Sequence, residues 1–175
     1  MDAPKPQPAE DAADQPLDPS ADAVPTSAGV ILPPPVIFLL AIALGVVLEV
    51  WLPSRWIPAP IGLIVGIAIC TCAVGLLVWT LAVMRQARTA IAPWRTTTQL
   101  ITSGPFRLLR NPIYLSFTAI HFGLAAITGS AWLLASGLLA FVIVNWGVVS
   151  REERYLETIF GETYEHYKQR VDRWL

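Results

Sequence analysis

Four long apolar stretches constrain the fold of this chain more than any other feature of the sequence. They cover residues 36–52, 61–84, 112–127 and 131–149, and each is close to the roughly 17 to 25 residues that a membrane-spanning helix needs. Only 14% of the residues are charged, against roughly 25% in a soluble domain. The sequence therefore predicts an all-α integral membrane protein with about four transmembrane helices.

Turn-forming residues separate these stretches. Prolines between residues 53 and 60 divide the first two, and Thr128-Gly129-Ser130 predicts a tight antiparallel hairpin between the last two. The third stretch is the shortest. It needs residues near Leu108 and Leu109, or the interfacial zone, to complete its crossing.

The first 30 residues have a different composition. They contain six acidic residues, six prolines and a single lysine. Such a segment buries too little apolar surface to offset the entropy lost on ordering, and it lacks the basic region that begins a signal peptide. We expect a disordered, acidic, proline-rich tail at residues 1–30, followed by one multi-pass membrane domain at residues 31–175.

The basic residues predict how the domain is oriented. Five arginines lie between the second and third stretches and five lysines or arginines follow the fourth, whereas the opposite side carries only Arg55. Loops on the cytoplasmic side of a membrane carry an excess of Lys and Arg. We therefore expect a protein of the plasma or inner membrane, with both termini and the polar motifs in the cytoplasm.

The cysteines and histidines do not indicate a metal site. Cys70 and Cys72 point about 200° apart on a helix, so they are interpreted as small apolar side chains. His121 and His166 are far apart in the sequence, whereas a structural zinc ion takes four ligands. We expect no metal and no nucleic-acid partner, and the oligomeric state stays open.

The segment between the second and third stretches combines apolar, aromatic and basic residues. Trp94 and Arg95 are typical of an anchor at the membrane interface. The same segment is also suited to cap a cavity, as functional loops do. The two interpretations are compatible.

A polar motif directly precedes the third stretch. Gly104-Pro105 predicts a tight turn whose backbone a ligand can approach closely, and Pro112 suits the first turn of a helix. Arg107 and Arg110 lie between them, with Tyr114 one turn after Arg110. Flanking cytoplasmic charge is the alternative explanation for both arginines, but their position beside Tyr114 favours a binding site.

A second polar motif, Arg151-Glu152-Glu153-Arg154, follows the fourth stretch. The spacing of apolar residues from 156 to 167 predicts an amphipathic helix at the membrane surface. Because acidic residues favour helix N-termini, Glu152 and Glu153 alone are typical of a solvated helix start. Next to the bilayer and within reach of Arg110, one of them is a better candidate for holding a cationic group.

Besides serines and threonines, the predicted spans contain Glu49, His121 and Asn145. Such residues either make hydrogen bonds between helices or line a functional cavity. We take His121 and Asn145 as candidate substrate-binding residues.

Three motifs in this order resemble a known family. Residues 104–114 (GPFRLLRNPIY), 152–156 (EERYL) and 160–167 (FGETYEHY) are similar to the isoprenylcysteine carboxyl methyltransferase family, which is related to the phospholipid N-methyltransferases. The resemblance covers about residues 87–175. One departure is Asn111, which stands where the best-known form has histidine and which can hydrogen-bond but cannot act as a base. Another is Phe106, which replaces a frequent tyrosine.

The resemblance implies a membrane methyltransferase that binds S-adenosylmethionine on its cytoplasmic side. Arginine suits the cofactor's carboxylate, and glutamate its ammonium or ribose. Carried over residue by residue, the cofactor site consists of Gly104, Pro105, Arg110, Asn111, Pro112, Tyr114, Glu152 and Glu153, with Arg110 and Glu153 as catalytic residues.

The methyl acceptor is expected to be a lipophilic or prenylated molecule that arrives from the bilayer. Carboxyl O-methylation of the isoprenylcysteine type is the main expectation. Two alternatives stay open: N-methylation of a phospholipid or small lipid, and a membrane scaffold that has lost its chemistry.

Overall fold

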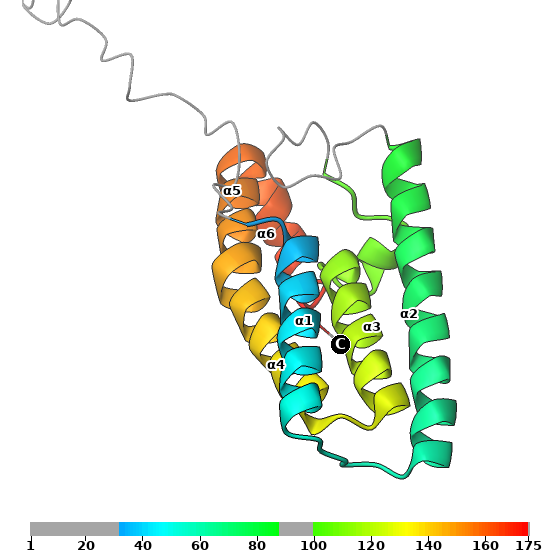
Figure 1. Ribbon diagram of the computed structural model, residues 1–175. Coiled ribbons are helices and arrows are strands. Elements are labelled where there is room, and N and C mark those ends of the chain that lie inside the picture. Colours follow the sequence, from blue (N-terminus) through cyan, green and yellow to red (C-terminus); the bar gives the residue numbers. More distant parts are fainter. Residues whose placement is uncertain (1–31, 88–99, 175) are drawn as a thin grey trace, which may run out of the picture.

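The computed structural model describes residues 32–87 and 100–174, and the regular structure in these residues is entirely helical (Figure 1). Its elements are α1 (Pro34–Trp51), α2 (Ala59–Gln86), the 3₁₀ helix η1 (Gly104–Arg107), α3 (Pro112–Thr128), α4 (Ala131–Val144), the π-helical η2 (Asn145–Val149), α5 (Ser150–Phe160) and α6 (Glu162–Lys168). The all-α prediction is confirmed. The predicted tail at 1–30 and the segment around Trp94 and Arg95 lie outside the described residues.

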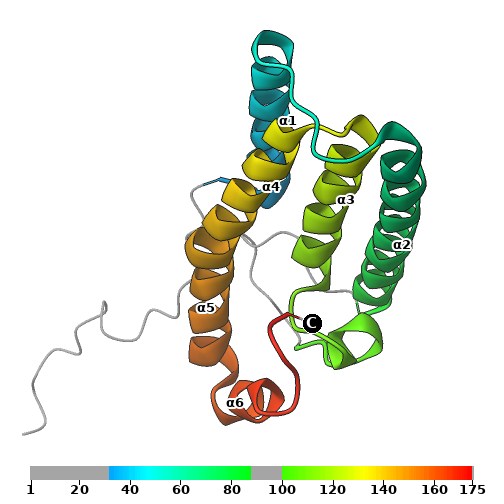
Figure 2. The ribbon, with the colours of Figure 1, turned by 90° about the horizontal axis from the view of Figure 1, so that it is seen from below.

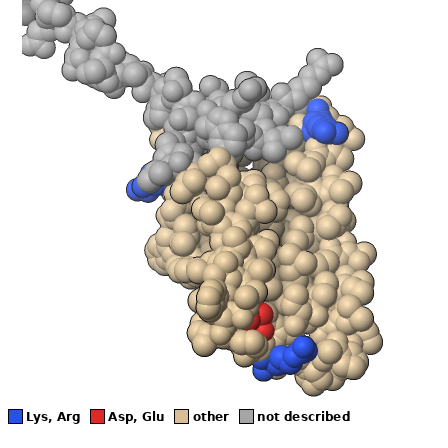
Figure 3. Space-filling view, in the orientation of Figure 1, with Lys and Arg blue, Asp and Glu red and all other residues tan. Residues whose placement is uncertain are grey.

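Three helical segments of the described chain are long and apolar enough to cross a membrane: α1, α2 and the continuous run Ala131–Phe160. The fourth, α3, has 17 residues, which at 1.5 Å per residue is about 26 Å, somewhat less than a hydrocarbon core of roughly 30 Å. Leu39, Ile64 and Trp146 are each more than 60% exposed, and the face in Figure 3 carries charge only near its ends. A surface this apolar is suited to lipid, so the prediction of a membrane protein is confirmed.

The hairpin of α3 and α4 forms the centre of the bundle, with α2 packed along α3 and α1 along α4 (Figures 1 and 2). The turn is made by Gly129, whose φ of 69° is in the left-handed region that glycine adopts easily. The next residue, Ser130, caps α4 because its Oγ accepts a hydrogen bond from the Leu133 amide. The hairpin predicted at residues 128–130 is confirmed.

Small residues let α2 and α3 approach closely. A Cβ added to Gly66 would lie 2.5 Å from the carbonyl oxygen of Gly123, and Gly123 in turn lies against the thiol of Cys70. Close backbone approach through small residues is a main source of helix association in lipid, where no hydrophobic effect drives it. Cys70 and Cys72 are both free thiols. Cys70 packs as a small residue in this contact, as its sequence context predicts, and its thiol also donates to the Ile120 carbonyl at 3.7 Å.

A polar cluster around Glu49 stabilises the end of the bundle where α3 turns into α4. The Glu49 carboxylate accepts hydrogen bonds from the Ser54 amide and hydroxyl, both at 2.8 Å, and from the Ser130 hydroxyl at 2.6 Å. These bonds connect the end of α1 to the α3–α4 turn. Of the two interpretations of Glu49, the hydrogen bond between helices is the one observed.

The chain after α4 differs from the prediction of one amphipathic surface helix. Helix α5 continues α4 through η2 (Figure 1), and Gly161 then breaks the helix with φ 48° and ψ −128°, a conformation that side chains disfavour. The shorter α6 follows. Residues 169–174, which we name the C-terminal strap, then return toward the start of α3 (Figure 2).

Two glycines of α2 offer a matched test of the packing. Gly66→Ala should lower the stability of the protein by about 1 to 3 kcal/mol, because the added methyl overpacks the contact with α3. Gly75→Ala should leave stability unchanged or raise it by up to about 1 kcal/mol, since a Cβ at Gly75 meets nothing within 4 Å. Thermal unfolding in detergent measures both. Equal effects of the two substitutions would contradict the packing described here.

Candidate functional site

The turn before α3 is held against α2. Gly104 has a φ of 60°, and a Cβ on it would lie 2.8 Å from Val83 Cγ2, so glycine meets both a backbone and a packing requirement here. Buried Pro105 follows, and its carbonyl accepts hydrogen bonds from the Leu108 and Leu109 amides. Leu109 is 2% exposed. This packing fixes the position of the next residue, Arg110.

The two arginines of the motif have different environments. Arg107 is exposed, as expected of a flanking charge. The side chain of Arg110 is 12% exposed, and its Nη1 lies 3.1 Å from Glu153 Oε1. The Arg110 amide also donates to the carbonyl of Asp172 in the C-terminal strap at 2.9 Å. Flanking charge therefore explains Arg107 but not Arg110.

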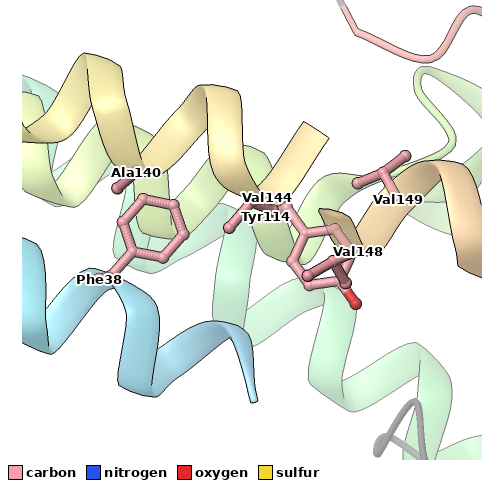
Figure 4. Packing of buried hydrophobic residues seen from close by; sticks show 6 residues of the cluster. All are labelled: Phe38, Tyr114, Ala140, Val144, Val148 and Val149. Atoms are coloured by element: carbon pink, nitrogen blue, oxygen red, sulfur yellow. The ribbon is translucent and has the colours of Figure 1, made fainter. Parts of the chain in front are cut away.

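Asn111, Pro112 and Tyr114 build the first turn of α3. Pro112 occupies the first turn, where its missing N–H costs nothing. The Asn111 side chain does not cap the helix and donates instead to the Arg173 carbonyl at 3.4 Å. The Tyr114 hydroxyl donates to Glu152 Oε2 at 2.8 Å. The Tyr114 ring packs in an apolar cluster with Phe38, Ala140, Val144, Val148 and Val149 (Figure 4).

The two adjacent glutamates of α5 have different partners. Successive residues of a helix point about 100° apart, and Glu152 is accordingly bound by Tyr114 whereas Glu153 contacts arginines. Glu153 is 6% exposed. It lies between Arg110 and Arg173, and the Nε of Arg173 donates to its Oε1 at 3.1 Å while Nη2 contacts Oε2. Buried carboxylates need such pairing, so Glu153 is the centre of this cluster.

The C-terminal strap contributes two residues that sequence reasoning did not identify as part of the site. Besides Arg173, the strap supplies Trp174, whose Nε1 donates to Asn145 Oδ1 at 3.0 Å and whose ring centroid lies 5.1 Å from that of Phe141. The only sequence signal was a basic–aromatic pair after an amphipathic segment. Local patterns carry no information about where a short non-helical segment returns.

Tyr164 and Tyr167 of α6 lie on the side of the cluster that faces η1. The Tyr167 hydroxyl donates to the Phe106 carbonyl at 2.6 Å, and burial raises the pKa of Tyr167 to about 12. Burial, and after it the charge of Glu153, also raise the pKa of Tyr164, with Arg110 acting in the opposite direction. Both phenols therefore stay protonated at neutral pH.

Most of the residues predicted from sequence meet at this end of the bundle, but His121 does not. It lies nine residues along α3 from Pro112, or about 13 Å. Its Nε2 is 3.0 Å from the Leu133 carbonyl, and it is 1% exposed. Because a carbonyl only accepts, Nε2 carries the proton of this bond. The residues that the structure does bring together are Gly104, Pro105, Arg110, Asn111, Pro112, Tyr114, Asn145, Glu152 and Glu153.

The buried guanidinium of Arg110 has donors to spare. Among the described residues, neither its Nε nor its Nη1 has a hydrogen-bond acceptor, and both atoms are buried. The contact with Glu153 is thus an ion pair without hydrogen-bond geometry. Arg110 contacts Glu153, and the adjacent Glu152 carboxylate is held by Tyr114. A cation with unpaired donors and a second carboxylate in the same cluster can bind a zwitterion, with one charge on each group.

The two ion-paired glutamates of α5 should respond differently to loss of charge. Glu153→Gln should lower the stability of the protein by about 3 kcal/mol, because it leaves two guanidinium groups without their shared carboxylate. Glu157→Gln should cost less than about 1 kcal/mol, since its partner Lys168 is 28% exposed and also lies 3.3 Å from Glu165. SDS-induced unfolding compares the two. A smaller cost at Glu153 than at Glu157 would refute the central role of Glu153.

Comparison with known proteins identifies a family whose matching segment contains most of the candidate site. Residues 61–163 match the phospholipid methyltransferase family, over more than half of the chain. An uncharacterized protein of Haemophilus influenzae is 42% identical over 66 residues, which cover 36% of this chain and 100% of that protein. No solved structure matches the chain.

Two similar proteins carry names that state an activity. A probable protein-S-isoprenylcysteine O-methyltransferase of Oryza sativa is 37% identical over 79 residues, or 42% of this chain and 38% of that protein. Methanethiol S-methyltransferase 1 of Bradyrhizobium diazoefficiens is 33% identical over 66 residues, or 38% of this chain and 22% of that protein. The chain therefore spans between 22% and 38% of the length of these two relatives.

The matched segment contains the turn before α3, the Arg110 motif and the glutamate pair. The resemblance carried by these motifs is confirmed at the level of the family. The chain belongs to the phospholipid methyltransferase family, and proteins named as isoprenylcysteine O-methyltransferases are among its relatives.

Proposed function

We propose that this protein is an S-adenosylmethionine-dependent methyltransferase of the membrane that acts on a lipophilic acceptor, with carboxyl O-methylation of the isoprenylcysteine type as its reaction. One observation carries the proposal. Arg110, whose Nε and Nη1 are buried without a hydrogen-bond acceptor among the described residues, contacts Glu153, and the adjacent Glu152 carboxylate is held by Tyr114.

These groups fit the amino-acid part of S-adenosylmethionine. Arg110 suits the carboxylate, because a guanidinium offers a carboxylate several charge-assisted hydrogen bonds. Glu152 suits the ammonium, since Glu153 is already shared by two arginines. Glu153 then holds Arg110 in place. The bound cofactor supplies the methyl group, and the protein has to align donor and acceptor in a site that excludes water.

An apolar groove supports a lipophilic acceptor. It has a volume of about 400 Å³ and lies between Ile37, Leu40 and Leu44 of α1 and Leu139 and Ile143 of α4. Four of these five side chains are between 45% and 60% exposed on the apolar surface, so a chain from the bilayer can reach the groove.

The position and charge of the groove connect it to the cluster. Ala140 and Val148 belong both to its lining and to the apolar cluster that contains Tyr114. Arg151 also lines the groove and directly precedes Glu152. A cation in this position favours an acceptor with an anionic head, such as a carboxylate, which is already nucleophilic. An amine acceptor would first need a base to remove its proton.

The charges at the two ends of the bundle support a cytoplasmic site. The end that holds η1, α5 and α6 carries Arg85, Arg107, Arg110, Arg151, Arg154, Lys168, Arg170 and Arg173, and the described part of the other end carries Arg55. By the excess of positive charge on the cytoplasmic side of membranes, the cluster faces the cytoplasm of a plasma or inner membrane.

Cofactor binding tests the proposal directly. Calorimetric titration of the detergent-purified protein with S-adenosylmethionine should show binding that weakens at least tenfold in Arg110→Ala and in Glu152→Ala. Arg107→Ala should stay within twofold of the parent, because Arg107 comes from the same motif but is exposed. A folded parent protein that does not bind the cofactor would contradict the proposal and favour a scaffold.

The acceptor groove is testable at Gly147, which lines it and where an added Cβ meets nothing within 4 Å. Gly147→Leu should fill the groove and reduce methylation of a farnesylcysteine analogue at least tenfold, with cofactor binding unchanged. Gly75→Leu is the control, since it adds the same side chain to an equally open position on α2.

Transfer of a radiolabelled methyl group is the readout for both variants. The same assay with phosphatidylethanolamine separates the two enzyme classes, because methylation of this amine and not of the carboxylate would replace the O-methylation proposal. Equal loss in both variants would contradict the assignment of the groove.

A further inference from the structure

The C-terminal strap ends inside the candidate site. Its backbone carbonyls accept from the Arg110 amide and the Asn111 side chain, and its Arg173 side chain contacts Glu153. Trp174 donates to Asn145 and packs on Phe141. The strap thus contacts the start of α3 as well as α4, η2 and α5, and it forms one side of the site.

Glu153 has more positive than negative charge around it. Two guanidinium groups, from Arg110 and Arg173, lie within 4 Å of one carboxylate. The neighbouring carboxylate, Glu152, is bound to the Tyr114 hydroxyl and, within the described residues, makes no ion pair with either arginine. Arg173 binds Glu153 through two nitrogens, whereas Arg110 approaches it through Nη1 without a hydrogen bond.

Because of this difference, we assign the two arginines different roles. Arg173 neutralises Glu153 and satisfies both of its oxygens. Arg110 stays paired with Glu153 at 3.1 Å, but its buried Nε and Nη1 have no hydrogen-bond acceptor among the described residues. An anion that reaches them can supply one. Without Arg173, Glu153 would have Arg110 as its one cationic partner among the described residues.

We propose that Arg173 is a positioning residue, which holds Glu153 so that Arg110 can bind the carboxylate of the cofactor. The inference rests on the proposed function, because it names the part of S-adenosylmethionine that the strap controls. Arg173 lies outside the three sequence motifs. The proposal therefore gives a residue of the C-terminal strap a role in cofactor affinity, namely holding Glu153 in place.

The test uses two ligands that differ by one group: S-adenosylmethionine and its decarboxylated form, titrated into the full chain in detergent. Arg173→Gln should weaken binding of S-adenosylmethionine at least tenfold and change binding of the decarboxylated form less than twofold. A merely structural strap would weaken both ligands alike.

A matched control comes from the same strap. Arg170 is exposed, and its Nε donates to the backbone carbonyl of His166. Arg170→Gln should change the affinity for either ligand less than twofold. Arg173→Lys keeps the charge but loses the two-nitrogen contact, and it should bind S-adenosylmethionine with an affinity between those of the parent and Arg173→Gln. It also serves as the test variant if Arg173→Gln does not fold.

The outcomes separate the two proposals. Binding of S-adenosylmethionine by the parent with equal losses for both ligands in Arg173→Gln, or with no loss for either, overturns the role of Arg173 and leaves the proposed function standing. A folded parent that binds neither ligand overturns the proposed function, and the role of Arg173 with it.

Discussion

The buried carboxylate of Glu153 is the interaction on which the rest of the site depends. It joins Arg110, at the start of α3, to Arg173, in the C-terminal strap, across segments that are far apart in the sequence. A carboxylate that is 6% exposed would be very unfavourable alone. The end of the chain, the start of α3 and α5 must therefore assemble together, and the position of Arg110 follows from that assembly.

The bundle supplies the rigid frame for this cluster. In lipid the helices gain little from the hydrophobic effect, so close contacts at Gly66 and Gly123 and the polar cluster at Glu49 hold them together. The Glu49 cluster lies at the opposite end from the site. The end that carries Arg110 and Glu152 is stabilised instead by the ion pairs of Glu153.

The sequence predicted the elements set by hydropathy and turn chemistry. The four apolar stretches match α1 to α4 with η2 to within two residues at each end. The Gly129 turn and the closeness of a glutamate to Arg110 are as expected, whereas their ion pair was not predicted. The break at Gly161 was missed, because a glycine in an amphipathic pattern is compatible with a continuous helix. Arg173 and Trp174 were missed since their partners are reached by a return of the chain that has no periodic signal.

The most direct test of this account is a crystal structure of the protein with S-adenosylhomocysteine, the demethylated form of the proposed cofactor. The account predicts that the ligand's carboxylate lies within about 3 Å of the Arg110 guanidinium, with its amine at Glu152 and Arg173 still on Glu153. A ligand bound elsewhere, or one whose amino-acid end points away from an Arg110 that stays on Glu153, would contradict it.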